Sequence, residues 1–273
     1  MKPVRLGWGF WVAVGWLGIV VLAAIFADFL PIPDPKAFAT APPNLGPSIH
    51  HLLGTDNGGG DVFSQLIFGS RVSIVVGLGS IAIGIVFGGG FGIIAGYYGK
   101  SVDFVSNSVA IIVLSFPPLI LVMGLISFAG RKLFVITLAI GIVAMPLIFR
   151  IVRTSTQSFV QREFVLAAKA MGAPTHRIII REIIPNVAMT ALAFIFIAVG
   201  VAIVSESALS FLGLSVPPPT PTWGNMINVG TSVLETNSIL WIWPSLALFF
   251  TVLSLNLTGD KLRKKFGVKE SIL

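Results

Sequence analysis

The sequence predicts an all-α integral membrane protein with six transmembrane helices and both termini in the cytoplasm. Of the 273 residues, 55% are hydrophobic and only 11% are charged, and the mean hydropathy is +0.95, a composition at which a soluble domain would precipitate. Uncharged runs close to the roughly 20 residues that a helix needs to cross the hydrocarbon layer recur along the chain. Basic residues gather in alternate connecting segments, as they do in multi-pass membrane proteins.

The uncharged runs divide one membrane domain, residues 1–273, into six spans. The spans are expected at about 7–30, 72–98, 104–129, 132–152, 187–209 and 237–258, with an outside segment at 31–71, a cytoplasmic loop at 155–186 and an outside loop at 210–236. A short interfacial helix is expected to lead into the second span. The first run follows Lys2 and Arg5 but exceeds the about 7 to 15 apolar residues of a signal peptide, which predicts an uncleaved signal anchor.

The basic residues orient these spans. With a cytoplasmic N-terminus, 14 of the 18 Lys and Arg residues lie inside and only 4 lie outside, as the positive-inside rule requires. Topology therefore explains the net charge of +7, and nucleic acid is not an expected partner. The basic tail after the last span suits anionic lipid of the inner leaflet, so membrane lipid is an expected partner.

A stripe of glycines marks the second span. Gly77, Gly84, Gly88, Gly92 and Gly96 fall mostly four residues apart on one helical face. Small residues let helix backbones approach closely, so this face packs either within the chain or against a partner subunit.

Three further residues in or near the spans are candidates for a pathway or gate. Pro117 and Pro118 in "SFPPLIL" remove backbone donors in mid-membrane and should kink the third span, either to shape a translocation path or only as a packing feature. Glu206, near the outer end of the fifth span, either lines an outer gate or is hydrogen-bonded at a helix end.

Catalytic, metal and nucleotide sites are not expected. The chain has no Cys, no carboxylate pair emerges, and the adjacent His50 and His51 should diverge rather than share a metal. The G-K-S at residues 99–101 lacks the glycine that a P-loop needs five residues earlier, because Ile94 stands there. No cofactor is expected, and without an intramembrane proton relay any uphill transport must draw its energy from another protein.

The cytoplasmic segment "REFVLAAKAMGAPTHRIIIREIIPN" (162–186) predicts a helix-turn-helix. Gly172 suits a C-terminal cap, Pro174 suits a first helical turn, and the second helix should run to Ile184 and be stopped by Pro185. Apolar residues recur at helical spacing in the first helix: Val160, Phe164, Ala167, Ala168 and Met171. These features alone favour an amphipathic helix pair at the membrane surface.

This segment resembles the EAA loop of ATP-binding-cassette importer permeases. That loop has the pattern E-A-A, three residues, G, nine residues, I-x-L-P, and Ala167, Ala168, Gly172 and Pro185 fall on it with the correct spacing. The chain departs from it where Leu166 replaces the glutamate, and it also lacks the isoleucine and leucine before the proline.

The resemblance is closer to the peptide-permease branch of that family. "EFVLAAKAMGA" and "REIIPN" fit its form, and "LLGTDNGGGDVFSQLIFGSRVSI" is similar to its G-T-D motif, although Gly60 replaces the usual arginine. Five other stretches are similar to its signatures in the same order: "AGYYG", "LSFPPL", "SESALSFLGL", "PPPTPTWG" and "LNLTGDKLR". On these motifs the chain is identified as a member of the C-type dipeptide or oligopeptide permeases.

The resemblance implies a non-enzymatic transport subunit in a bacterial or archaeal cytoplasmic membrane. Its partners would be a homologous B-type permease, two cytoplasmic ATPases and an extracytoplasmic substrate-binding protein. Substrates of similar importers include peptides, nickel chelates, glutathione and haem, so the substrate stays open, and a stand-alone channel or carrier is the remote alternative.

In such importers the EAA loop couples the permease to the ATPase. By analogy, Ala167, Ala168 and Gly172 would make the close contact, and candidates for polar contacts at its rim are Glu163, Lys169 and Arg181. Pro185 completes the coupling motif.

Overall fold

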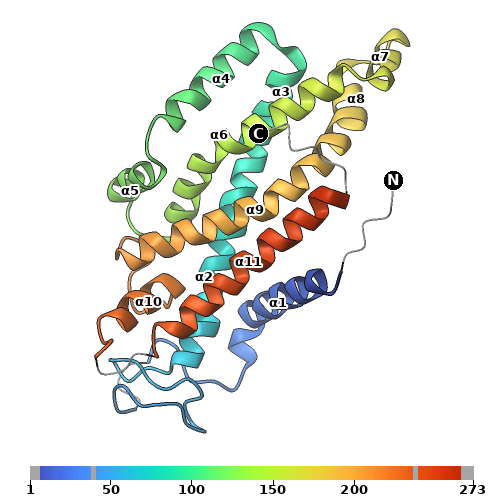
Figure 1. The fold of residues 1–273 in the computed structure, drawn as a ribbon. Coiled ribbons are helices and arrows are strands. Elements are labelled where there is room, and N and C mark those ends of the chain that lie inside the picture. The colour runs from blue at the N-terminus through green and yellow to red at the C-terminus, as the bar shows by residue number, and fades with distance from the viewer. Residues whose placement is uncertain (1–6, 38–40, 236–238, 266–273) are drawn as a thin grey trace.

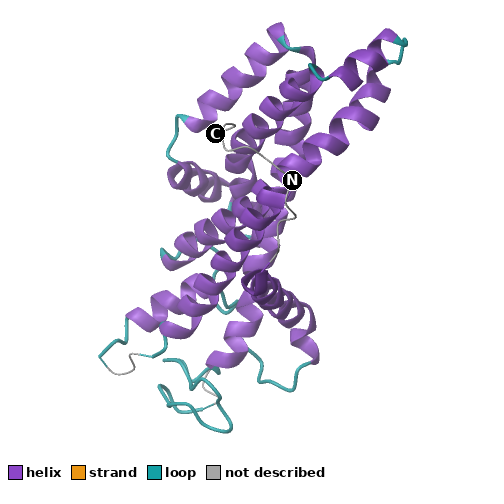
Figure 2. Ribbon diagram, turned by 45° about the vertical axis from the view of Figure 1, so that its right-hand side comes forward, coloured by secondary structure: helices purple, strands orange, loops and turns teal. Residues whose placement is uncertain are grey.

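The computed structural model describes residues 7–37, 41–235 and 239–265, and these residues form helices and loops without a strand (Figures 1 and 2). The expected cytoplasmic termini, and the first residues of the span expected at 237–258, lie outside the described residues. The helical elements are α1 (Gly7–Phe26), η1 (Ala27–Phe29), α2 (Val62–Ile83), η2 (Gly84–Gly89), α3 (Gly90–Tyr98), α4 (Lys100–Leu114), α5 (Pro118–Ala129), α6 (Leu133–Val160), α7 (Glu163–Ala170), α8 (Thr175–Ile178), η3 (Ile179–Ile183), α9 (Ile184–Phe211), α10 (Trp223–Thr231) and α11 (Ile242–Lys265).

Five helical stretches of the described chain are long and apolar enough to cross a membrane. They are Gly7–Phe29, Val62–Tyr98, Leu133–Val160, Thr175–Phe211 and Ile242–Lys265. The pair α4 and α5 supplies a sixth span if it is counted as one. The predicted all-α membrane fold is therefore confirmed.

The third span is broken rather than kinked. Helices α4 and α5 meet at an angle of 86° instead of forming one helix over 104–129. Pro117 caps α5 in an extended conformation with ψ of 127°, and Pro118 opens the helix. Two consecutive prolines lack the amide donors that would continue α4, and each disfavours helical geometry in the residue before it, so the chain changes direction here.

The second span begins earlier than expected. Asp61 caps α2 by accepting a hydrogen bond from the Ser64 backbone amide at 2.7 Å, and the helix then runs without interruption into the membrane stretch. A separate interfacial helix before this span was a wrong expectation, because the cap places the helix start at Val62.

The glycine stripe packs within the chain. A Cβ atom at Gly92 would lie 2.9 Å from a backbone oxygen of α6, and one at Gly96 would lie 2.7 Å from another. Gly84 and Gly88 also face α6, and Gly77 faces α9. The stripe therefore joins α2, η2 and α3 to their neighbours, which decides between the two interpretations of this face.

The helices form a layered bundle around α2, α6 and α9. Helices α1 and α11 pack on one flank, while α4 and α5 extend from the other (Figure 1). Ion pairs fix both flanks, since Arg71 binds Asp28 beside α1 at 2.7 Å and Arg153 of α6 binds Asp103 of α4. We call the end that carries α7 the inner end and the end that carries residues 41–61 the outer end, following the expected topology (Figure 1).

Candidate functional site

The inner end of the bundle carries a short helical hairpin, which we call the inner hairpin (residues 163–183). Helix α6 continues to Val160, α7 follows after two residues, and α8 returns toward the bundle through η3 into α9 (Figure 1). Both arms are thus direct extensions of membrane helices. A force applied to the hairpin acts directly on the fourth and fifth spans.

The turn of the inner hairpin is fixed by main-chain hydrogen bonds. Gly172 has a φ of +75°, a conformation that residues with a Cβ rarely adopt. Its amide donates to the Lys169 carbonyl at 3.0 Å, and the Ala173 amide donates to the Ala168 carbonyl at 3.0 Å. These two bonds form a Schellman motif, so the glycine cap expected from the sequence is present. Pro174 precedes α8 as its N-cap rather than entering its first turn.

Three buried aliphatic residues anchor the inner hairpin to the bundle. Val165 and Ile183 are 0% exposed and Ile178 is 2% exposed, and all three belong to the main hydrophobic core. Burying each such side chain contributes about 2 kcal/mol, so the hairpin is held as part of the folded body. Of the apolar residues at helical spacing in this helix, Phe164 is 40% exposed, and Val165 occupies the buried position.

The outward face of the inner hairpin is small and partly apolar. Ala167 is exposed, and a Cβ at Gly172 would meet nothing within 4 Å, so both positions lie open to approach. Met171 is 81% exposed and Leu166 is 52% exposed beside them. Ala168 is half-buried against the core, so it lies behind this face rather than at its centre. The open face offers apolar surface and backbone to a partner.

The charged candidates divide into two groups. Glu163 and Arg181 are exposed, as a rim role requires. Lys169 is exposed too, but its ammonium group lies 5.0 Å from the ring centroid of Tyr97 at the end of α3, which is a cation–π contact within the chain. Lys169 therefore links the inner hairpin to the second span.

Pro185 does not end a helix, which corrects the expectation from the sequence. The helix passes from α8 through the π-helical η3 into α9, and the Ile184 amide donates to the Ile179 carbonyl five residues earlier. Proline has no amide donor, and its ring clashes with a carbonyl in a regular α-helix. The wider π turn before Pro185 opens the backbone there and lets the helix continue.

The pathway candidates lie apart from the inner hairpin along the chain. Pro117 and Pro118 are exposed at the break between α4 and α5. Glu206 lies in the outer half of α9, where it is 0% exposed and its Oε1 accepts a 2.8 Å hydrogen bond from the Ser215 hydroxyl. This geometry agrees with the hydrogen-bonded interpretation of Glu206 more than with a solvent-lined gate.

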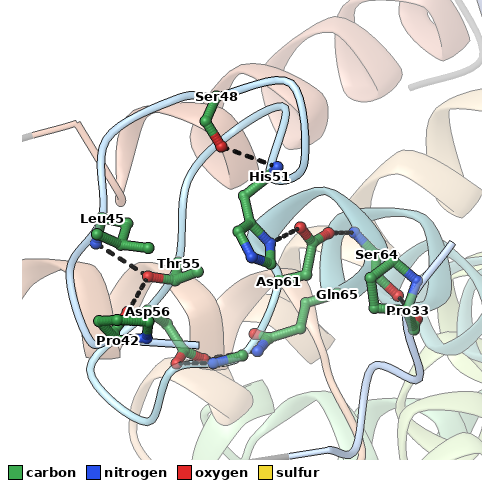
Figure 3. Close-up of polar contacts among 11 residues, drawn as sticks. Pro33, Pro42, Leu45, Ser48, His51, Thr55, Asp56, Asp61, Ser64 and Gln65 are labelled. Atoms are coloured by element: carbon green, nitrogen blue, oxygen red, sulfur yellow. Dashed lines mark hydrogen bonds and ion pairs between the residues drawn. The ribbon is translucent and has the colours of Figure 1, made fainter. Parts of the chain in front are cut away.

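The outer segment contains a polar cluster that the sequence motifs did not predict (Figure 3). Asp56 accepts hydrogen bonds from the amides of Gly58 at 2.8 Å and Gly60 at 2.9 Å, and from the Gln65 side chain at 2.5 Å. A Cβ at Gly60 would lie 2.5 Å from the amide nitrogen of that same Gln65 side chain. The signal was an aspartate followed by a run of glycines, which is typical of an Asx turn.

Asp61 and Thr55 complete this outer cluster. Asp61 accepts from Ser64 and contacts Nδ1 of His51 at 2.9 Å through its second oxygen. The Thr55 hydroxyl accepts from the Leu45 amide at 2.9 Å and donates to the Pro42 carbonyl at 2.7 Å. His51 is thus a structural partner of Asp61, and the described residues contain no group of three or more metal-ligating side chains.

Comparison with known proteins places this arrangement among transport proteins. The family model described as "Binding-protein-dependent transport system inner membrane component" matches residues 88–267, which include the inner hairpin. The dipeptide transport system permease protein DppC of Alkalihalophilus pseudofirmus is 32% identical over 258 residues, covering 93% of this chain and 85% of that protein.

Two similar proteins carry a different substrate in their names. The glutathione transport system permease protein GsiD of Pectobacterium atrosepticum is 34% identical over 280 residues, covering 98% of this chain and 93% of that protein. The GsiD protein of Escherichia coli O1:K1 is 33% identical over 252 residues, covering 92% and 83%.

Proposed function

We propose that this chain, which belongs to the family of inner membrane components of binding-protein-dependent transport systems, is a permease subunit of an ATP-driven importer of di- or oligopeptides. It forms half of the translocation pathway. It is a multi-pass membrane protein, and the energy for transport comes from ATP hydrolysed by separate subunits.

The geometry of the inner hairpin supports a role in coupling the permease to the ATPase. Its turn is fixed by the Schellman motif at Gly172, and Val165, Ile178 and Ile183 anchor it in the core. Its outward face at Ala167 and Gly172 is open. A rigid element with a small exposed face on two span extensions is suited to docking in a groove of an ATPase and to passing movement to the spans.

The complete importer contains further subunits. A homologous B-type permease supplies the other half of the pathway, two cytoplasmic ATPases or ATPase domains dock at the inner hairpins, and an extracytoplasmic protein delivers substrate at the outer end. Within this chain, Ala167 and Gly172 form the close contact and Glu163 and Arg181 lie at its rim. Ala168 packs the hairpin against the core, Lys169 joins it to the second span through Tyr97, and Pro185 lies where the hairpin continues into the fifth span.

Peptides are the proposed substrate class because a dipeptide permease is similar over most of this chain. Glutathione is the second candidate, since the glutathione permeases are equally similar and their cargo is itself a short peptide with charged ends. Nickel chelates and haem remain alternatives within the same class of importer.

Reconstitution tests this function directly. The chain is purified in mild detergent with its co-purifying subunits, placed in proteoliposomes and supplied with the binding protein. Dipeptide should then enter only with ATP, and each substrate should raise ATP hydrolysis if the binding protein delivers it. Glutathione uptake without peptide uptake would move the assignment to the second candidate, and transport by the lone chain without ATP would identify a channel or carrier instead.

A further inference from the structure

The helices at the inner end form a unit of their own, which we call the inner block (residues 90–114 and 147–183). It contains α3, α4, the later part of α6 and the inner hairpin (Figure 1). Ala95 of α3, Ala110 of α4 and Phe149 of α6 are buried together in a small hydrophobic cluster that is distinct from the main core. The other described residues are called the main body below.

Polar and backbone contacts also hold the inner block together. Arg153 of α6 donates hydrogen bonds to both carboxylate oxygens of Asp103 in α4, one of them at 2.6 Å. The Lys169 ammonium group of α7 lies over the ring of Tyr97 in α3. A Cβ at Gly96 of α3 would lie 2.7 Å from the Arg153 carbonyl oxygen, so the backbones of α3 and α6 are in contact. All the long helices of the block are thus joined to one another.

The main body has separate bonds of its own. The Ser80 hydroxyl of α2 donates to the Thr137 carbonyl in the first part of α6 at 2.9 Å, and this bond is buried. The Trp223 side chain of α10 donates to the Leu66 carbonyl of α2 at 2.9 Å. These bonds lie on the outer side of the points at which the chain enters the inner block.

The chain passes between the two units at four points, all within the described stretch 41–235, and a regular α-helix is interrupted at each of them. The four interruptions are the π-helical η2 in the second span, the break at Pro117 and Pro118 in the third, Pro146 inside α6 in the fourth and the π-helical η3 before Pro185 in the fifth. Prolines and π turns remove regular helical hydrogen bonds, and helices bend most readily where they occur.

The boundary between the two units has room for movement. A Cβ at Gly88 of η2 would overlap the Met145 carbonyl oxygen, so two of the four interruptions lie directly on each other, backbone against backbone. Beside them an apolar groove of about 560 Å³ separates Ile93 and Ile151 of the inner block from Ala191 of α9. The side chains of the described residues therefore do not fill the space between the units.

From this arrangement we propose that the inner block tilts as one unit against the main body, with the four interruptions as its hinge. The trigger, a movement of the inner hairpin, rests on the coupling role proposed above. The hairpin continues along the chain only into the fourth and fifth spans. The second and third spans follow it through Tyr97 and Asp103, so Asp103 positions α4 on the moving block.

Distances between pairs of spin labels test this proposal, because the chain contains no Cys and each pair can be introduced alone. Phe104→Cys in α4 with Ser158→Cys in α6 measures a distance within the inner block. Phe104→Cys with Trp11→Cys in α1 measures a distance between the block and the main body. All three positions are exposed.

The importer complex in lipid nanodiscs is measured with and without a non-hydrolysable ATP analogue. The distance between the labels at 104 and 11 should shift by about 4 Å, because a tilt of about 15° around the middle of a layer roughly 30 Å thick displaces its surface by that much. The distance between the labels at 104 and 158 should not change.

A pair of glycine variants tests the hinge. Gly90 lies at the end of η2 and Gly124 lies inside α5, and a Cβ at either position meets nothing within 4 Å. Alanine favours a regular helix over a bent one, so Gly90→Ala should lower the population at the shifted distance about fivefold. Gly124→Ala should leave this population unchanged.

A pair of aspartate variants tests the link to the third span. Asp103→Asn weakens the ion pair between α4 and α6, and the distance between the labels at 104 and 158 should then become broadly distributed. Asp28→Asn weakens an ion pair to Arg71 within the main body and should not affect that distance.

Two results would overturn the proposal. Equal shifts in both label pairs would show that α4 and α6 do not move as one block, and equal, unchanged distributions in both would show that the whole bundle is a single rigid body. Failure of the proposed function would look different. Without nucleotide the pair at 104 and 11 should already have the broader distribution, whereas a lack of ATP hydrolysis in the same sample would count against the importer assignment alone.

Discussion

The outer cluster and the inner hairpin both lie at the ends of apolar membrane helices, yet their side chains point in opposite directions. In the outer cluster, side chains of Thr55, Asp56 and Asp61 turn inward and bond to the segment itself (Figure 3). In the inner hairpin the main chain forms the fixing bonds, and side chains such as Met171 extend outward.

This difference suits the outer cluster to stabilising the fold and the inner hairpin to the docking role proposed for it. A buried polar group needs a partner, so a network that satisfies its own groups specifies a fold and leaves little for another protein. A turn fixed by backbone bonds leaves its side chains for contact with a partner. We therefore expect changes in the outer cluster to alter stability and changes in the inner hairpin to alter coupling.

The largest effect is expected at the turn of the inner hairpin. Gly172→Pro cannot adopt a φ of +75° and loses the amide that binds the Lys169 carbonyl. Coupled transport should fall by roughly tenfold or more because the two arms can no longer meet in this geometry, while membrane insertion is retained. Substrate-stimulated ATP hydrolysis of the reconstituted importer measures this.

Gly172→Asn is the matched control, since asparagine tolerates the left-handed conformation and keeps its amide donor. It should retain most of the stimulation. Normal stimulation in Gly172→Pro would show that the turn geometry does not matter for coupling.

A smaller effect of another kind is expected in the outer cluster. Asp61→Ala removes the cap of α2 and the contact with His51, which should lower the free energy of unfolding by about 1 to 2 kcal/mol. Thermal unfolding in detergent measures it, and Asp61→Asn should recover much of the loss because the amide oxygen still caps. Substrate-stimulated ATP hydrolysis per folded molecule should not change. A loss of this stimulation in folded Asp61→Ala would show that the outer cluster, like the inner hairpin, acts in coupling.

The smallest effect is expected at the contact between the inner hairpin and α3. Lys169→Met keeps the aliphatic chain but removes the charge that lies over Tyr97. This loss should lower the free energy of unfolding by about 0.5 to 1 kcal/mol. Tyr97→Phe keeps the ring face and should behave as the parent protein. If Lys169→Met instead abolishes binding of the ATPase without changing stability, then Lys169 belongs to the contact rim as the sequence analysis expected.

Much of the fold follows from local rules that the sequence obeys. The apolar runs define the spans, and Gly172 marks its turn because few other residues adopt that conformation. The prediction that Pro185 ends a helix was wrong because that rule assumes α-helical geometry. The backbone instead widens into a π turn just before this proline. The direction of the break at Pro117 and Pro118 depends on how α5 packs on α6, which no local rule contains.

The candidate site was also predictable only where local sequence rules determine it. Spacing identified the hairpin and its glycine, but whether Ala167 or Ala168 faces outward depends on how α7 rotates against the bundle. That rotation is set by Val165, which reaches a core made from distant helices. Lys169 could not be paired with Tyr97 from the sequence, since about 70 residues separate them and only the packing of α7 near α3 joins them.

If an ATPase covers the open face of the inner hairpin as proposed, single-cysteine labelling will detect the cover. The chain contains no Cys, so Ala167→Cys introduces one thiol on that face, and Ile49→Cys introduces one at a 93% exposed position of the outer segment. We predict that maleimide labelling at position 167 falls strongly when the ATPase subunits bind, while labelling at position 49 does not change. Equal labelling at position 167 with and without the ATPase would show that the ATPase does not cover this face.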